Sequence, residues 1–591
     1  MNQNDSKKFK IAFIFFIQFL LFLVLIFAIF RILSHSTDLP KLEATETDKA
    51  IRGDILSKNH YTMATSKKLY TAQIDTRCID PDKYELFVNL FSIFSKIDPY
   101  TIKEKLASNF GFVNISCTLD SKSARYLKQL RYNLARYRVF RKYIDEKTGH
   151  TLDHGLSIFE TGEYRQYPLQ DSFSPYIGFM KKELKNNYQT IWGKYGLEKF
   201  YNEQLEGIQS TKISGRRDIH GNIILDRHSE VKNRIDGYDL ITSISLKMQK
   251  ELEHILDIQR KRIGAKEIIA SVMESKTGNI IALASSRRYN PNKITVDDVP
   301  NTNISAIRYI FEPGSVMKVI AYSLLLDEGV IKPNDIVNVE NGRYHLGNKV
   351  ITDEHKYDYL STENIIVHSS NIGMAKLSKL LDTITFFKGL RDFGFSRKSG
   401  IDLSDELSGS IPNIHQLKNS IFKATASYGY GIRVNFFQLL KAYNIFNNDG
   451  LMLKPTIGEY FNPHIHKLRK IYHKKKTPVI SETTAHTMQR ILIKTVNEGT
   501  GKKAITPGLY VGGKTGTAQI AQRGIYTNLY NSSFFGFAND AKHKYTIGVT
   551  VIEPSPQKKQ YFASQSAVPV FKDIVDILIA DKFLIPLNYR H

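Results

Sequence analysis

Three short motifs contain residues that could carry out acyl transfer, and the first of them is Ser315–Lys318. A Pro-Gly pair precedes it and an apolar stretch with helical spacing follows. On a helix Ser315 and Lys318 would share one face, so their side chains could meet. A desolvated, neutral lysine can take the proton of a serine hydroxyl and make that oxygen nucleophilic. The competing interpretation is that Ser315 only caps the helix, and Ser-x-x-Lys also begins at Ser229, Ser420 and Ser555.

The second motif is Ser369-Ser370-Asn371, where a loop passes into an apolar helical stretch. The hydroxyl of Ser369 could relay a proton, and the amide of Asn371 could hold an amide of a substrate. Helix capping is the alternative, because serine and asparagine are common at helix starts.

The third motif is Lys514-Thr515-Gly516-Thr517, between two segments of β type. Glycine lets another backbone approach a strand closely, and a lysine with two hydroxyls could bind a carboxylate. Lys-Thr-Gly also occurs at Lys147 and Lys276, so the tripeptide alone is not specific. The copy at Lys514 is the one that follows the other two motifs, and three weak signals in this order make a strong one.

The surrounding pattern predicts how these motifs are positioned. Leu240–Ser245 alternates like a strand and Leu246–Ile258 has helical spacing. Ile268–Met273 and Ile280–Ala284 flank a Gly-Asn turn, which indicates a hairpin. Helical patterns then dominate to about residue 450, and strands return after Leu509. We therefore expect an α/β (α+β) domain in which an antiparallel sheet adjoins a helical lobe.

Two further helices are predicted outside this region. Val570–Ile579 has the spacing of a packed amphipathic helix. Ser123–Ile144 is strongly basic on one face, for which a solvated helix face is favoured over a binding site.

The apolar stretch Ile11–Phe30 decides the predicted location. As a helix it would be about 30 Å long, the thickness of a bilayer core. Three lysines precede it and only Arg31 follows closely, so the positive-inside rule places the N-terminus in the cytoplasm and the bulk in the periplasm. A cleaved signal peptide is the alternative, but no Ala-x-Ala-like site follows. The predicted parts are a cytoplasmic tail (1–10), a transmembrane anchor (11–31), a linker (32–50), a pedestal domain (51–235) and a catalytic domain (236–591).

The composition sets limits on both fold and partners. Hydrophobic residues make up 42% of the 591 and charged residues 24%, which excludes disorder over most of the length. Lys and Arg exceed Asp and Glu by 82 − 58 = 24, which indicates an anionic neighbour or a lysine-rich proteome. An exported domain does not meet the chromosome, so nucleic acid is excluded as the anionic partner. Membrane headgroups and cell-wall polymer remain as candidates. The two cysteines, Cys78 and Cys117, are too few for a disulfide framework, and either a disulfide or two thiols is compatible with the sequence.

The order of the three motifs is that of the β-lactamases and penicillin-binding proteins, and residues 50–580 resemble the class B penicillin-binding proteins. In the family, the segment that Arg52–Ile55 matches usually continues with Asp-Arg-Asn-Gly, whereas this chain has Ser57–His60 there. Residues 60–165 match no family segment that we can place. Ser369-Ser370-Asn371 followed by Ile-Gly is similar to the division-type, FtsI-like branch. Further matching segments are Arg52–Ile55, Tyr167-Pro168, Gly196–Tyr201, Gly215–Arg217, Ala426–Gly431, Glu498–Gly501 and Ser533–Phe537.

The resemblance implies a serine β-lactamase-like transpeptidase domain on an elongated, dimerisation-type pedestal domain with a single transmembrane helix. It also implies a D-Ala-D-Ala transpeptidase that forms an acyl-enzyme on Ser315, with Lys318 as base and no metal or organic cofactor. Ser369 would relay a proton and Asn371 would hold the peptide amide. The terminal carboxylate would be bound by Lys514, Thr515, Gly516 and Thr517, and backbone N–H groups of Ser315 and Thr517 would form the oxyanion hole.

The implied partners are peptidoglycan stem peptides, β-lactams, the inner membrane, and a membrane glycosyltransferase with other division proteins. An elongation-type enzyme is one alternative. A β-lactam hydrolase or sensor is a second, but the Glu-x-x-Leu-Asn pattern of class A hydrolases does not occur. A division scaffold with little turnover is the third, and three complete motifs argue against it.

Overall fold

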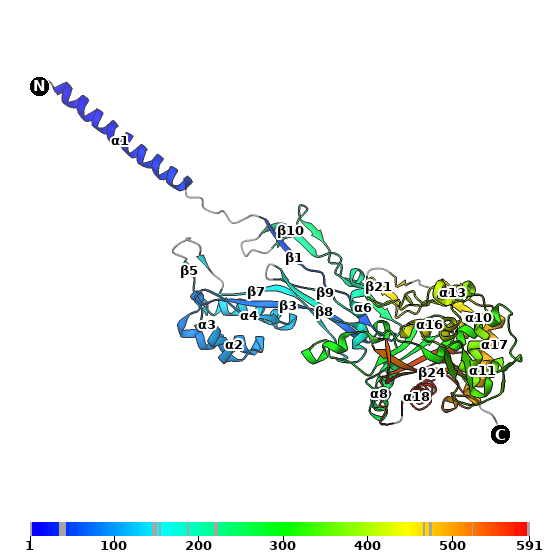
Figure 1. Ribbon diagram of the computed structural model, residues 1–591. Coiled ribbons are helices and arrows are strands. Elements are labelled where there is room, and N and C mark those ends of the chain that lie inside the picture. Colours follow the sequence, from blue (N-terminus) through cyan, green and yellow to red (C-terminus); the bar gives the residue numbers. More distant parts are fainter. Residues whose placement is uncertain are drawn as a thin grey trace. The chain divides into compact units, whose positions relative to one another are not determined.

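The computed structural model forms two compact units, one of residues 1–50 with 208–236 and one of residues 51–207 with 237–591. Residues 35–42 of the predicted linker lie outside the described residues. The described residues are 3–34, 43–144, 151–152, 155–185, 188–217, 223–464, 467–471, 475–522, 524–558 and 560–587 (Figure 1).

The first unit contains the apolar helix α1 (Gln3–Ser34) and a small antiparallel sheet. Within Lys7–Ser34 of α1, an 18-residue window has a mean hydropathy of 3.1 and no buried residue, and the helix is long and apolar enough to cross a membrane. The segment predicted to be irregular linker contains a strand, β1 (Glu43–Asp48), which pairs with β10 (Thr211–Arg217). Arg234 forms an ion pair of 3.0 Å with Asp48 across this sheet. The short strands β11 (Ile223–Ile224) and β12 (Glu230–Lys232) also pair with β10.

The N-terminal part of the second unit is built on a long sheet with helices beside it. Its order is β22-β21-β13-β2-β3-β7-β9-β8, with β4 on β3. The long strands β3 (Thr62–Asp75) and β7 (Leu156–Gln166) pair antiparallel. The remaining strands are β2 (Ile55–Leu56), β4 (Phe112–Leu119), β8 (Met180–Lys185), β9 (Tyr188–Gly193), β13 (Asp239–Thr242), β21 (Gly458–Asn462) and β22 (Arg469–Lys470).

Three helices share a hydrophobic core with β3 and β4: α2 (Tyr84–Ser95), α3 (Pro99–Ala107) and α4 (Ser121–Arg136). The prediction of one helix to residue 144 was wrong, because α4 ends at Arg136. Val139 and Phe140 are buried, and Phe140 bridges back to Ile79, so the chain must turn there. Cys78 is buried in this core, but the side chain of Cys117 lies outside the described residues, so the disulfide stays a prediction.

The C-terminal part of the second unit is built on a five-stranded antiparallel sheet of order β15-β14-β26-β25-β24, and the fold class is confirmed. On one side, α8 (Leu246–Ile263) and α18 (Ala567–Ala580) share a hydrophobic core with the sheet. On the other, α16 (Phe436–Asn447) and the helical lobe pack against it (Figure 1). The strands are β14 (Glu267–Glu274), β15 (Ile280–Ser285), β24 (Tyr510–Gln522), β25 (Ile525–Asn539) and β26 (Lys544–Ile552).

The helical lobe interrupts the sheet between β15 and β24. Its principal helices are α10 (Met317–Asp327), α11 (Thr362–Val367), α12 (Asn371–Ser378), α13 (Thr383–Asp392), α15 (Ser420–Ser427) and α17 (Glu482–Asn497). Two small two-stranded sheets that the sequence did not predict lie between α10 and α11. One pairs β16 (Ile336–Asn338) with β19 (Tyr359–Ser361), and the other is the hairpin of β17 (Arg343–Leu346) and β18 (Lys349–Thr352). Short elements complete the unit: α5 (Ser174–Ile177), α6 (Gly196–Phe200), α7 (Asn202–Leu205), α9 (Ser305–Arg308), α14 (Ile414–Leu417), β5 (Tyr143–Ile144), β6 (Thr151–Leu152), β20 (Leu451–Met452) and β23 (Thr477–Pro478).

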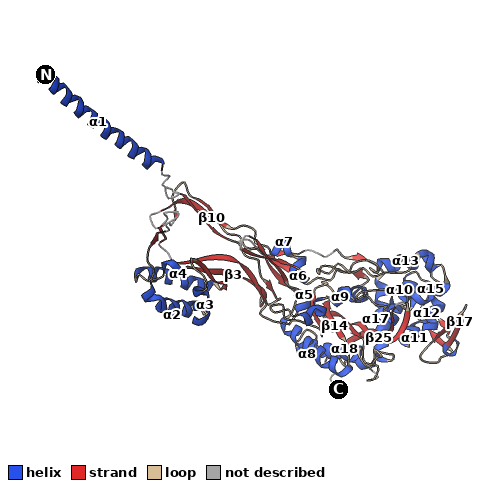
Figure 2. Ribbon diagram, turned by 60° about the vertical axis from the view of Figure 1, so that its left-hand side comes forward, coloured by secondary structure: helices blue, strands red, loops and turns tan. Residues whose placement is uncertain are grey.

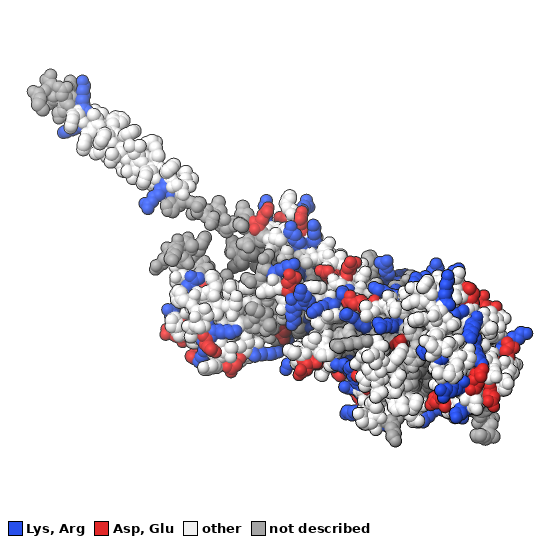
Figure 3. Space-filling view, viewed as in Figure 1, with Lys and Arg blue, Asp and Glu red and all other residues white. Residues whose placement is uncertain are grey.

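The surplus of basic residues does not gather into one patch on the face drawn in Figure 3. There, Lys and Arg side chains are interspersed with Asp and Glu. On α4 the apolar residues are the buried ones, so its basic face is solvated, as the sequence favoured.

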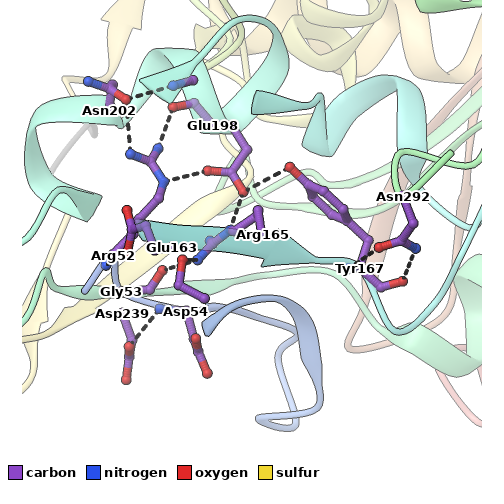
Figure 4. A network of polar contacts seen from close by, with 12 residues as sticks. Arg52, Gly53, Asp54, Glu163, Arg165, Tyr167, Glu198, Asn202, Asp239 and Asn292 are labelled. Carbon is purple, nitrogen blue, oxygen red and sulfur yellow. Dashed lines mark hydrogen bonds and ion pairs between the residues drawn. The ribbon is translucent and has the colours of Figure 1, made fainter. Parts of the chain in front are cut away.

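A buried ion network ties together three distant segments of the second unit (Figure 4). The carboxylate of Glu198 on α6 accepts hydrogen bonds from Nε of Arg52 (2.8 Å) and from Nε of Arg165 on β7 (2.7 Å). Arg165 also donates to the carbonyl oxygen of Gly53 (2.8 Å), and Arg52 donates to Asn202 (2.9 Å). Burial alone would raise the pKa of Glu198, but the two guanidiniums outweigh it and hold that pKa below its ordinary value.

We predict that Glu198→Gln lowers the free energy of unfolding by about 3–5 kcal/mol, because it leaves two buried guanidiniums without their carboxylate. The thermal unfolding of the full-length protein in detergent measures this. The matched control is Lys199→Ala on the same helix, which removes a half-exposed ion pair to Asp405 and should cost less than about 1 kcal/mol. Equal losses in the two variants would contradict a structural role for the network.

Candidate active site

Ser315 lies in a tight turn whose geometry leaves its hydroxyl available. Gly314–Val316 form a single 3-10 turn that leads into α10, and no side chain caps either of these two helices. The side chain of Ser315 is half-buried, and it makes no hydrogen bond with any residue that the structure describes. The alternative that Ser315 is a capping residue is therefore wrong.

The turn is held from three directions. The hydroxyl of Tyr443 on α16 donates to the carbonyl oxygen of Val316 (2.8 Å). The carboxylate of Glu312 accepts from the N–H of Gly431 (2.8 Å) and from the hydroxyl of Tyr526 (3.1 Å). Gly429 lies so close that an added Cβ would be 2.1 Å from the carbonyl oxygen of Gly314.

Lys318 is fully buried on α10, and its amine contacts the second motif. Its Nζ donates to the carbonyl oxygen of Ser369 and to the Ser369 hydroxyl (3.1 Å). The expected contact with Ser315 is not among the hydrogen bonds of the described residues, so Lys318 is fixed by Ser369 instead. Burial lowers the pKa of Lys318 from 10.5 to about 7, against the opposing charges of Asp353 and Glu354. Neither acidic residue was predicted from the sequence, because neither belongs to a motif.

The two serines of the second motif make different contacts. Ser370 is the N-cap of α12 and accepts from the N–H of Gly373 (2.9 Å). Helix capping is thus correct for Ser370, which leaves Ser369 to face Lys318. Ser369 adopts a left-handed backbone conformation (φ 61°). Asn371 begins α12, and its amide donates to the carbonyl oxygen of Thr352 (2.9 Å).

The third motif lies on β24, which ends the sheet and pairs with β25 alone among the described strands. A Cβ on Gly516 would be 2.8 Å from the carbonyl oxygen of Pro313, so this strand lies directly against the Ser315 turn. The first and third motifs are therefore side by side.

The polar side chains of the third motif are also well fixed. Lys514 is fully buried, and its Nζ donates to the carbonyl oxygen (3.3 Å) and hydroxyl (3.4 Å) of Thr515. Burial, and then the like charge of Lys318, hold the pKa of Lys514 well below its ordinary value. The Thr515 hydroxyl bonds that of Thr500 (2.7 Å), and the Thr517 hydroxyl accepts from the N–H of Ala563 (3.1 Å).

A cleft of about 570 Å³ opens beside β24. Its size suits a peptide segment, and its walls contain groups of both charges together with two hydroxyls of the third motif. Its lining residues include Glu354, His355, Tyr357, His368, Glu498, Lys502, Lys503, Thr515, Thr517 and Phe562.

This arrangement defines a serine acyltransferase site. A serine with an unengaged hydroxyl, a buried lysine of lowered pKa and a second serine bonded to that lysine are the elements of nucleophilic catalysis. An edge strand with lysine and threonines beside the serine can hold a carboxylate-bearing peptide in extended form.

Comparison with known proteins agrees with the site. Residues 268–576 match the family model of the penicillin-binding protein transpeptidase domain, and residues 47–242 match that of the penicillin-binding protein dimerisation domain. The chain therefore belongs to the penicillin-binding protein transpeptidase family, and it is a serine acyltransferase of the class B type.

Relatives and solved structures extend this similarity. Peptidoglycan D,D-transpeptidase FtsI of Buchnera aphidicola is 30% identical over 403 residues, covering 68% of this chain and 67% of the relative. Stage V sporulation protein D of Bacillus subtilis is 27% identical over 532 residues, covering 89% and 77%. The structure of penicillin binding protein 2X from Streptococcus thermophilus shares the fold, with a TM-score of 0.74 at 22% identity, covering 90% and 80%.

We predict that Gly429→Ala slows acylation by a labelled penicillin about tenfold or more, because the added methyl displaces the Ser315 turn. Labelling of the purified full-length protein for a series of fixed times measures the rate. Gly431→Ala is the matched control. It forces alanine into a similarly left-handed backbone (φ 76° against 92°) but meets no atom within 4 Å. A rate loss as large in the control would assign the effect to backbone strain.

Proposed function

We propose that the chain is a peptidoglycan D,D-transpeptidase in which Ser315 attacks the penultimate D-Ala carbonyl of a stem peptide. As the Ser315 oxygen bonds to that carbon, its proton passes to the neutral amine of Lys318. The tetrahedral intermediate collapses, the bond to the terminal D-Ala breaks, and an acyl-enzyme remains. The observation that carries the proposal is the buried Lys318 amine, which has a pKa of about 7 and lies against Ser369.

The other motif residues have complementary roles in this proposal. Ser369 relays the proton from Lys318 to the departing amine of D-Ala, and Asn371 holds the peptide amide. Lys514, Thr515 and Thr517 bind the terminal carboxylate, while Gly516 keeps the strand against the Ser315 turn. Backbone N–H groups of Ser315 and Thr517 stabilise the negative oxygen of the intermediate. The amine of a second stem peptide then attacks the acyl carbon and forms the cross-link. The ester bond to Ser315 breaks, and the proton that the amine loses returns to the Ser315 oxygen.

We further propose that this cross-linking takes place at the septum. Two features support a division role: the sequence Ser369-Ser370-Asn371 with Ile-Gly after it, and the similarity to a relative named FtsI. The sporulation relative shows that similar chains carry other names, so elongation remains the second candidate. In this proposal the N-terminus lies in the cytoplasm, since three lysines precede the apolar helix and Arg31 alone follows it closely. The bulk lies in the periplasm, where β-lactams, a membrane glycosyltransferase and other division proteins are its partners.

We predict that acylation by penicillin rises with pH through about 7 and then levels off, because Lys318 must be neutral to take the proton. Lys318→Arg should fold normally but acylate at least about 100-fold more slowly, since arginine keeps its proton. Intact-protein mass after timed exposure to penicillin measures both, with Ser315→Ala as the variant that gains no mass. Near wild-type acylation of Lys318→Arg would mean that the proton leaves through another group, with Ser369 the first candidate.

We predict that depleting the protein from its native cells produces filaments without septa, because side-wall synthesis continues. A wild-type copy should restore division and a Ser315→Ala copy should not; rounded, dividing cells would instead indicate the elongation role.

The orientation can be tested in the same cells. A labelled penicillin that stays outside the inner membrane should label the chain in spheroplasts, and labelling only after lysis would contradict the orientation.

A further inference from the structure

Asp353, in the segment that follows β18, makes a concentrated set of contacts with the second motif. Its carboxylate accepts hydrogen bonds from the hydroxyl of Ser370, from the N–H of Asn371 (2.5 Å) and from the N–H of Ile372 (3.1 Å). The residue before it, Thr352, accepts from the side chain of Asn371 (2.9 Å). Two consecutive residues of one hairpin segment therefore hold both Ser370 and Asn371.

These contacts go beyond what the helix itself requires. The N-terminus of α12 already has a side-chain cap, Ser370, and the Asp353 carboxylate adds to it. A carboxylate is favourable at a helix N-terminus because it meets unpaired N–H groups. The carboxylate thus fixes the first turn of α12 from outside the helix.

Ser369 directly precedes this turn, so the turn determines where Ser369 lies. A non-glycine residue with φ of 61° is strained and persists only where its surroundings determine it. On one side of Ser369, its carbonyl and hydroxyl oxygens accept from Lys318. On the other side, the next two residues are bound by Asp353. The left-handed conformation that turns Ser369 toward the lysine is consequently held between these two groups.

Asp353 also belongs to the charges that surround Lys318. Asp353 and Glu354 act on Lys318 with opposite charges from the segment after β18. Lys514 on β24 is the neighbouring lysine, and its own pKa is lowered by the charge of Lys318. Of the two carboxylates, Asp353 has the larger influence, and it raises the pKa of Lys318 against the effect of burial.

We propose that Asp353 is a positioning residue of the transpeptidation reaction, which fixes the Ser369–Asn371 turn against Lys318 and adds a negative charge to the surroundings of that lysine. The inference rests on the proposed function, because it gives Lys318 and Ser369 their catalytic roles. It assigns the β17–β18 hairpin, which lies beside α12 in Figure 2, to the support of the active site.

The test is the rate of acylation by a labelled penicillin across pH 5–9, measured with full-length wild type and variants. Asp353→Asn should lower the limiting rate about 10- to 100-fold, since a small displacement of reacting groups costs that much. Its pH midpoint should move below that of the wild type, because losing the negative charge lowers the pKa of Lys318 further. Asp353→Glu keeps the charge, so it should keep the wild-type midpoint and recover part of the rate.

The matched control is Asp382→Asn. Asp382 caps the neighbouring helix α13 by accepting from the N–H groups of Ile384 and Thr385, and it is not among the charges that affect Lys318. This variant should keep both the wild-type rate and the wild-type midpoint.

Three outcomes would overturn the inference: an Asp353→Asn rate within twofold of the wild type, a lowered rate with an unmoved midpoint, or an equal loss in Asp382→Asn. The second outcome would reduce Asp353 to a helix-capping role. If thermal unfolding shows that Asp353→Asn is not folded, the pH midpoint and the acylation rate of Asp353→Glu decide the question. Failure of the wild type itself to acylate would instead contradict the proposed function.

Discussion

The catalytic centre depends on the burial of one lysine amine. Moving the pKa of Lys318 from 10.5 to about 7 means that the site destabilises the charged form, relative to water, by about 5 kcal/mol. A buried neutral amine is still a polar group, and it needs hydrogen-bond partners of its own. The two oxygens of Ser369 supply them. The same contact that satisfies the lysine therefore fixes the second serine, which explains why the first two motifs must lie together.

The position of the third motif follows from the edge of the sheet. Only an edge strand has backbone groups left to bind an extended peptide, and β24 is such a strand. It must also reach the Ser315 turn, and side chains at Gly516 or Gly314 would separate the two. Hydrophobic cores on both faces of the sheet hold β24 in this place. The chemistry thus uses a rigid sheet on one side and the helical lobe on the other.

The sequence predicted those parts of the structure in which local pattern and final position agree. The β14–β15 hairpin, α8 and α18 have regular periodicity, and the three motifs stand out by residue type and order. The end of α4 could not be predicted, because it is set by the burial of Val139 and Phe140 against distant residues. The same reason hid Asp353 and Arg165. Each acts through partners far along the chain, and nothing in its own neighbourhood distinguishes it from an ordinary surface residue.

The two buried lysines also couple substrate binding to catalysis in the proposed reaction. Lys514 has a pKa far below its ordinary value, and the charge of Lys318 contributes to that shift. One of the two amines therefore carries a proton more easily when the other is neutral. The carboxylate of an arriving donor favours a proton on Lys514, because opposite charges stabilise each other in a water-poor site. A protonated Lys514 in turn opposes a charge on Lys318 and keeps that amine ready to accept the proton of Ser315. The terminal carboxylate of the substrate thus acts at the nucleophile as well as at its own binding site, through two amines of like charge.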